Sequence, residues 1–182
     1  MAEFVYVDNS NVFIEGKRVS AVKQGMALDI DDAHRHNILD HGYRMDFGKL
    51  HDFVAGNDPK QIKRAVLFGS RPPSNDSLWS IAKKVGFETV ILDRNRANKE
   101  KKIDTGIVTM MMQDAYKLMD RKKDTMTLVS GDGDFVPTFN ALRGDGFRVE
   151  VVFWGHASSE IKRSCDKFIN LNAYLDVVRL DP

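Results

Sequence analysis

Continuous apolar runs alternate along this chain with stripes of apolar residues at helical spacing. The runs have the length of strands that are buried on both faces, and they cover Phe4–Val7, Ile62–Phe68, Phe87–Leu92, Met126–Val129, Phe147–Phe153 and Phe168–Leu171. The stripes predict helices over Phe47–Val54, Leu78–Val85, Asp104–Arg121, Phe135–Leu142 and Ser159–Ser164. This alternation predicts a three-layer α/β/α fold with a mainly parallel sheet of five or six strands.

Residues 16–44 interrupt the alternation and are predicted to be a long insert after the first strand. The segment carries His34, His36 and His41, but their spacing matches no zinc-binding pattern. We therefore interpret it as a solvated surface segment. Long connections in compact domains are often functional or mobile, so two roles stay open: gating a cleft, or a contact between the subunits of a homo-oligomer.

Composition limits the classes of function. The 182 residues fit one domain over residues 1–182, and the net charge of +1 gives no strong bulk attraction to nucleic acid or membrane. A polyanion site must therefore be a local patch. The single cysteine, Cys165, excludes an internal disulfide and a cysteine-based zinc cluster. The lack of a leader and of a long apolar run predicts a soluble, cytoplasmic protein without membrane contact.

Acidic residues follow two of the predicted strands where each strand ends. The run Met126–Val129 enters the turn Ser130–Asp134, and the first strand ends at Asp8. Because the carboxyl ends of parallel strands meet at one edge of a sheet, we expect these acids to lie together, with Asp104 at the start of a helix nearby. Each acid taken alone also fits a helix cap or a turn residue.

A cluster of carboxylates without cysteine ligands suits Mg²⁺ or Mn²⁺, which prefer oxygen and can bind against a phosphodiester. The predicted catalytic and metal-binding residues are Asp8, Asp104, Asp132 and Asp134. Residues expected to orient these acids or bound waters are Asn9, Ser10, Asn11 and Ser130. The sequence contains no serine nucleophile elbow, Walker loop or Gly-x-Gly-x-x-Gly motif, which argues against those enzyme classes.

Three motifs carry a family resemblance: Asp8-Asn9-Ser10-Asn11, Lys102-Ile103-Asp104, and the stretch from Leu128 to Pro137. They resemble the NYN domain family, the LabA-like members of the PIN-like ribonucleases. The resemblance covers about residues 4–171, and the last motif is its most specific part. It implies a PIN-like, Rossmann-like α/β/α fold and Mg²⁺- or Mn²⁺-dependent cleavage of RNA.

The resemblance also implies a role for individual residues. Asp8 would be the metal ligand of the first strand, and Asp104 matches the acid in the family's Lys-Gly-Val-Asp segment. Asp132 and Asp134 match the paired acids after the fourth strand, and Asn11 matches the asparagine of the first motif.

Two departures from the family pattern keep a non-catalytic relative open, one that binds RNA or a protein partner without cutting. The segment Lys101–Asp104 lacks the usual glycine, and Met110 stands where many relatives carry a further acid. Asp114 does not replace that acid, since ten residues along a helix fall about 80° short of whole turns.

The segment Asp93–Lys102 has no apolar residue except Ala97, and it is predicted to be a basic loop. Such a loop is either solvated or a rim that contacts the phosphates of RNA. Basic residues also occur at Lys17 and Arg18, which are expected to be exposed. The candidate RNA contacts are Lys17, Arg18, Arg71, Arg94, Arg96, Lys99, Lys101 and Lys102.

Two other enzyme classes share part of this pattern. The turn Gly131–Asp134 resembles an acidic motif of haloacid dehalogenase-type phosphatases, but Ser10 occupies the place of their second aspartate. A toprim-like nuclease would need a glutamate where this chain has Asp8. The best prediction is therefore a metal-dependent ribonuclease, an endonuclease in which metal-activated water attacks the RNA phosphate in line.

Overall fold

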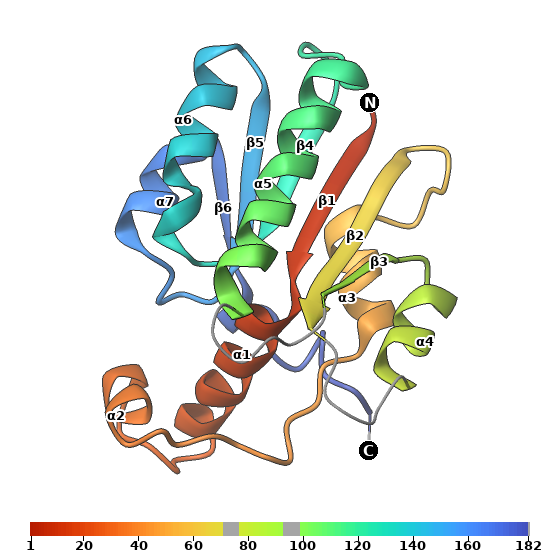
Figure 1. Cartoon of the computed structure of the whole chain (residues 1–182). Helices are drawn as coiled ribbons and strands as arrows, with labels where there is room; N and C mark the ends of the chain where they lie inside the picture. Colours follow the sequence, from red (N-terminus) through yellow and green to blue (C-terminus); the bar gives the residue numbers. More distant parts are fainter. Residues whose placement is uncertain (71–76, 93–98, 182) are drawn as a thin grey trace.

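The computed structural model describes residues 1–70, 77–92 and 99–181, with only the backbone of residues 99–102. Within these ranges six strands form one parallel sheet in the order β3-β2-β1-β4-β5-β6 (Figure 1). The strands are β1 (Glu3–Asp8), β2 (Ile62–Ser70), β3 (Glu88–Leu92), β4 (Thr125–Val129), β5 (Arg148–Phe153) and β6 (Lys167–Asn170). The α/β fold and the parallel sheet expected from the sequence are confirmed.

Helices cover both faces of the sheet. They are α1 (Asn9–Lys23), α2 (Ile30–Arg35), α3 (Phe47–Ala55), α4 (Ser77–Lys84), α5 (Lys99–Lys117), α6 (Val136–Gly144) and α7 (Ser159–Ser164). In Figure 1, α5 and α6 pack side by side in front of the sheet, while α3 lies behind β1 and β2. None of these helices, in the ranges that the structure describes, is long and apolar enough to cross a membrane.

The two central strands, β1 and β4, are the most deeply buried part of the sheet. Phe4 to Val7 are all buried, as are Thr125 to Val129, which explains their continuous apolar sequence. The strands run parallel and in register, with Val7 opposite Val129. From β1 the chain builds the sheet toward β3, and from β4 toward β6. The carboxyl edge between β1 and β4 is therefore the topological switch point, where α/β folds bind ligands.

The predicted insert begins too early, because residues 9–23 form the regular helix α1. The sequence pattern does not predict this helix, because its buried face includes Gly16 and Ser20 and so lacks a continuous stripe of large apolar residues. A Cβ at Gly16 would stand 2.7 Å from the Trp154 ring, so the small residue lets α1 approach the sheet closely. The Ser20 hydroxyl is satisfied by a 2.6 Å hydrogen bond to Asp40.

The helix expected to begin at Asp104 starts five residues earlier, at Lys99. The basic segment Asp93–Lys102 is thus a helix in its last four residues and not a loop, while residues 93–98 lie outside the described part of the chain. Charge explains the error: Lys99 to Lys102 contribute no apolar position to the helical stripe on which the prediction depended.

Candidate metal centre

The turn after β4 is built so that Asp132 faces the edge of the sheet. Its Oδ1 accepts a 2.9 Å hydrogen bond from the backbone N–H of Asp134 and caps the 3₁₀ turn η1 (Gly133–Phe135). At Gly131 a Cβ would stand 2.2 Å from the Phe153 ring. Only glycine fits there, which lets the turn press against β5. The capping role that the sequence allowed for Asp134 belongs instead to Asp132.

Asp8 ends β1 and caps α1, accepting a 3.2 Å hydrogen bond from the backbone N–H of Asn11. The residue is only 8% exposed. Burial, helped by the nearby charges of Asp104 and Asp132, raises the pKa of its carboxyl to about 6, although hydrogen bonds from the backbone N–H groups of Asn11 and Ser10 act in the opposite direction. Asp8 therefore lies in a crowded acidic environment.

Asp104 reaches the same edge from α5, in the second turn of that helix. Ligand oxygens of Asp104, Asp132 and Asp134 all lie within 4.8 Å of one another. Asp8 stands beside this trio and interacts with two of its members through charge. The structure thus brings the four acids predicted from the sequence to one edge, three of them in a single cluster.

Asn11 joins the first motif to the acidic turn. Its side-chain oxygen accepts hydrogen bonds from the Ser130 hydroxyl and from the backbone N–H of Gly131, each 3.1 Å long. Ser130 also accepts a 3.4 Å bond from the backbone N–H of Asp132. Asn9 and Ser10 form the first turn of α1, where the backbone N–H of Ser10 stabilises the Asp8 carboxylate. Asn11 and Ser130 therefore connect the first turn of α1 to the turn that carries Asp132.

The predicted RNA contacts divide into three groups. Lys17 and Arg18 were expected to be exposed, but both are only partly exposed. The Arg18 side chain is 14% exposed, forms an ion pair with Glu15 and donates a 3.2 Å hydrogen bond to the Asn37 side chain, while Lys17 lies over the Phe13 ring. Lys99, Lys101 and Lys102 belong to the first turn of α5, just before Asp104, and only their backbone is described. Arg71, Arg94 and Arg96 lie outside the described residues.

Asp114, on the same helix as Asp104, has a different environment. It is buried, accepts a 2.6 Å hydrogen bond from the Tyr6 hydroxyl, and forms an ion pair with Arg64 at 2.7 Å. Ten residues of helix separate it from Asp104 by about 15 Å along the axis. Asp114 is therefore part of the core under the sheet and not of the acidic cluster.

The structure also brings together a second group of ligand-type side chains, Glu15, His34 and His156, which the spacing of the histidines did not predict. The three residues come from α1, α2 and the loop after β5, so no spacing along the chain connects them. Helix α1, which was not predicted, carries Glu15 one turn after Asn11 and places it beside the two histidines.

The donor set of the acidic cluster fits a hard divalent cation. Three carboxylates within 4.8 Å repel one another, and a bound cation relieves that repulsion. All of the donors are oxygen atoms, which Mg²⁺ and Mn²⁺ prefer over nitrogen or sulfur. The elevated pKa of Asp8 agrees with an excess of negative charge at this edge.

Comparisons with known proteins agree with this architecture. The family model of the NYN domain matches residues 4–172. No curated protein matches the chain. A crystal structure of a protein of unknown function from Vibrio parahaemolyticus is similar, with a TM-score of 0.68 and 19% identity over 98% of this chain and 96% of that one. At this identity the likeness shows a shared fold alone.

Proposed function

Because the chain belongs to the NYN domain family, a family of PIN-like nuclease type, we propose that it is a metal-dependent ribonuclease, an endonuclease that hydrolyses RNA phosphodiester bonds. The observation that carries the proposal is the convergence of Asp104, Asp132 and Asp134 at the switch point of the sheet, beside Asp8. Family and geometry independently favour phosphodiester chemistry at this edge.

The four acids would hold Mg²⁺ or Mn²⁺, with Asp8 beside the trio of Asp104, Asp132 and Asp134. A divalent ion bound there would lower the pKa of a bound water and neutralise charge on the RNA phosphate. Asn11 fixes the turn that carries Asp132, and the Asp132 cap in turn fixes Asp134. The Asp132 carboxylate is therefore oriented before substrate arrives, which lowers the reorganisation needed for catalysis.

Loss of the family's further acid at Met110 leaves the cluster intact. On α5, Met110 lies about 9 Å along the axis and about 120° around it from Asp104. Its side chain packs against the hydrophobic core. The three converging carboxylates do not depend on that position, so a cation site can form without the further acid.

Basic residues at the start of α5 would guide RNA to the acids. Lys101 and Lys102 directly precede Ile103 and Asp104 in the sequence, so a phosphate bound by these lysines would lie near the metal site. Lysine contacts to phosphate supply affinity without reading sequence. We propose RNA as the substrate because NYN domains are generally RNA-associated.

Cleavage of labelled single-stranded and structured RNA tests the proposal, with Mn²⁺, Mg²⁺ or a chelator present. We expect metal-dependent cleavage by the wild type and at least about 100-fold slower cleavage by Asp132→Asn, since a ligand matters at least as much as its supporting contacts. Asp31→Asn, an exposed acid on α2, is the matched control and should cleave normally.

Two results would contradict the proposal. If the wild type and Asp132→Asn both bind RNA and neither cleaves it, the chain is a binding module. Release of phosphate from small phosphoesters in place of RNA cleavage would make it a phosphatase. Circular dichroism of Asp132→Asn separates a lost ligand from a lost fold.

A further inference from the structure

Glu15, His34 and His156 converge outside the acidic cluster. The Nε2 atom of His156 lies 2.7 Å from the Glu15 Oε2 atom, and the Nε2 atom of His34 lies 3.0 Å from the same oxygen. The two imidazole rings meet edge to face, with 5.5 Å between their centroids. The two imidazole nitrogens therefore face the same carboxylate oxygen.

The carboxylate at the centre of this group is oriented by a third partner. Arg18 forms an ion pair with the other oxygen, Oε1. That pairing fixes the carboxylate so that Oε2 faces the two histidines, as the outer partners of metal ligands commonly do.

We propose that Glu15, His34 and His156 form a binding site for a transition-metal ion of the zinc type, separate from the acidic cluster. Two imidazoles and one carboxylate are a ligand set that zinc accepts, whereas Mg²⁺ prefers oxygen alone. Ligands about 2.0–2.1 Å from a tetrahedral zinc ion stand roughly 3.3 Å apart. The observed 2.7 and 3.0 Å separations reach that value when the side chains move by a few tenths of an ångström.

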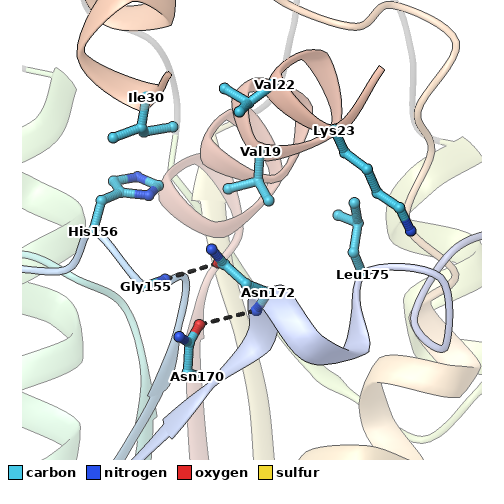
Figure 2. A pocket seen from close by; sticks show the side chains of 9 residues that line it. All are labelled: Val19, Val22, Lys23, Ile30, Gly155, His156, Asn170, Asn172 and Leu175. Atoms are coloured by element: carbon cyan, nitrogen blue, oxygen red, sulfur yellow. Dashed lines mark hydrogen bonds between the residues drawn. The ribbon is translucent and has the colours of Figure 1, made fainter. Parts of the chain in front are cut away.

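The loop that carries His156 is braced from β6. Gly155 donates its backbone N–H to the Asn172 side chain at 2.8 Å, and Asn172 donates its own N–H to Asn170 at 3.0 Å (Figure 2). These two bonds hold His156 at the margin of a cavity of about 670 Å³. Figure 2 shows its ring beside Ile30 of α2. The site is thus supported on its loop side before metal binds.

Access to the site is open on the side of α2. The side chain of His34 is 43% exposed, whereas those of His156 and Glu15 are 17% and 13% exposed. Solvent can therefore reach an ion held by these groups and supply its fourth ligand. A three-residue site with one solvent position is the arrangement of zinc sites that exchange a ligand, and not of closed structural ones.

Helix α1 would connect the two metal sites, since it carries both Glu15 and Asn11, the residue that holds the acidic turn. Glu15 follows Asn11 by one turn of α1, about 6 Å along the axis. The ligand atoms of the two sites differ, because the acidic cluster offers oxygen alone and the second site offers nitrogen and oxygen. A substitution in one site can therefore abolish metal binding there and leave the other site intact. The zinc proposal does not depend on the ribonuclease proposal, because metal binding is measured without RNA.

Binding of Co²⁺ and Zn²⁺ to the full chain tests the proposal. Co²⁺ in a tetrahedral nitrogen and oxygen site absorbs visible light, and Zn²⁺ should displace it with a stoichiometry of one. We expect His34→Ala and His156→Ala to weaken binding by at least about 100-fold, more than the loss of an outer partner. Asp132→Asn should retain the Co²⁺ spectrum, which separates this site from the acidic cluster.

His36→Ala is the matched control, since His36 is an exposed histidine of the same segment that pairs with Asp32. It should bind Co²⁺ as the wild type does. Because His34 is exposed, its alanine variant should fold, and Zn²⁺ should raise the melting temperature of the wild type but not of this variant. Equal metal affinity in the wild type and His34→Ala, or an equal loss in His36→Ala, would overturn the proposal.

Discussion

The side-chain oxygen of Asn11 lies 3.1 Å from the backbone nitrogen of Gly131, across 120 residues of chain. The bond ties the first turn of α1 to the turn that carries Asp132. Because Asp8 caps the same helix through the backbone of Asn11, one residue contacts both strands that end at the acidic cluster. Asn11 therefore connects Asp8 at the end of β1 with the turn that carries Asp132.

Replacing Asn11 with alanine should disturb the metal site more than the fold. The Gly131 N–H loses its acceptor, which we expect to lower the free energy of unfolding by about 1–3 kcal/mol. The Mn²⁺ concentration needed for half-maximal cleavage should rise about 10- to 100-fold, as for other supporting contacts of metal ligands. Asn140→Ala, an exposed asparagine on α6, is the control. An Asn11→Ala protein with unchanged Mn²⁺ dependence would show that Asn11 has no such role.

Asp8→Asn should remove a pH dependence of stability. The pKa of Asp8 is about 6 in the folded protein, against an ordinary value of 3.8. Since the folded form then holds the proton more tightly, the free energy of unfolding should fall as pH rises from about 4 to 6, and level off above that. The difference corresponds to about 3 kcal/mol at most. Asparagine cannot ionise and still caps a helix well.

We therefore expect metal-free Asp8→Asn to be more stable than the wild type at pH 7.5, by up to about 3 kcal/mol, although it should lose cleavage activity. Urea unfolding in chelator between pH 4 and pH 8 measures this. The two proteins should converge near pH 4, where Asp8 is protonated in the wild type as well. Parallel curves over the whole range would contradict an elevated pKa at Asp8.

The sequence predicted the sheet well because its central strands are buried on both faces. A continuous apolar run such as the one that ends at Leu128-Val129 is typical of a buried strand, and the acids that follow it then lie at the carboxyl edge of the sheet. Helix α1 was missed for the opposite reason, since close packing against Trp154 demands Gly16 on the buried face. Contacts that need small residues leave no hydrophobic pattern to read.

The acids of the candidate site could be predicted from the sequence, whereas the group that contains Glu15 and His34 could not. Asp132 and Asp134 follow a strand directly, so topology alone places them. The grouping of Glu15 with His34 depends on how α2 folds back on α1, which is a matter of tertiary packing. No local spacing encodes it.

Gly131→Ala should destabilise the protein through the Phe153 ring. The added Cβ would stand 2.2 Å from that ring, so the turn or the ring must move. We expect the free energy of unfolding to fall by about 1–3 kcal/mol, the usual range for overpacking, and metal-dependent cleavage to fall with the displaced turn. Thermal unfolding and the RNA assay measure the two effects.

Gly144→Ala is the matched control, because no atom lies within 4 Å of a Cβ at that position, the last residue of α6. It should be neutral or stabilise by up to about 1 kcal/mol. The double variant Gly131→Ala with Phe153→Leu should recover part of the lost stability, since leucine can yield space to the new methyl group. Equal stability of the Gly131 and Gly144 variants would contradict the close contact.

Asp114→Asn should separate a structural carboxylate from a catalytic one on the same helix. The substitution removes the charge that pairs with Arg64, while its amide oxygen can still accept the hydrogen bond of Tyr6. Because Arg64 is partly exposed, we expect a loss of only about 1–3 kcal/mol in the free energy of unfolding. Below the melting transition, RNA cleavage should stay within about twofold of the wild type, since Asp114 lies about 15 Å along α5 from Asp104. Loss of cleavage as complete as in Asp132→Asn, in a protein that remains folded, would place Asp114 in the catalytic machinery after all.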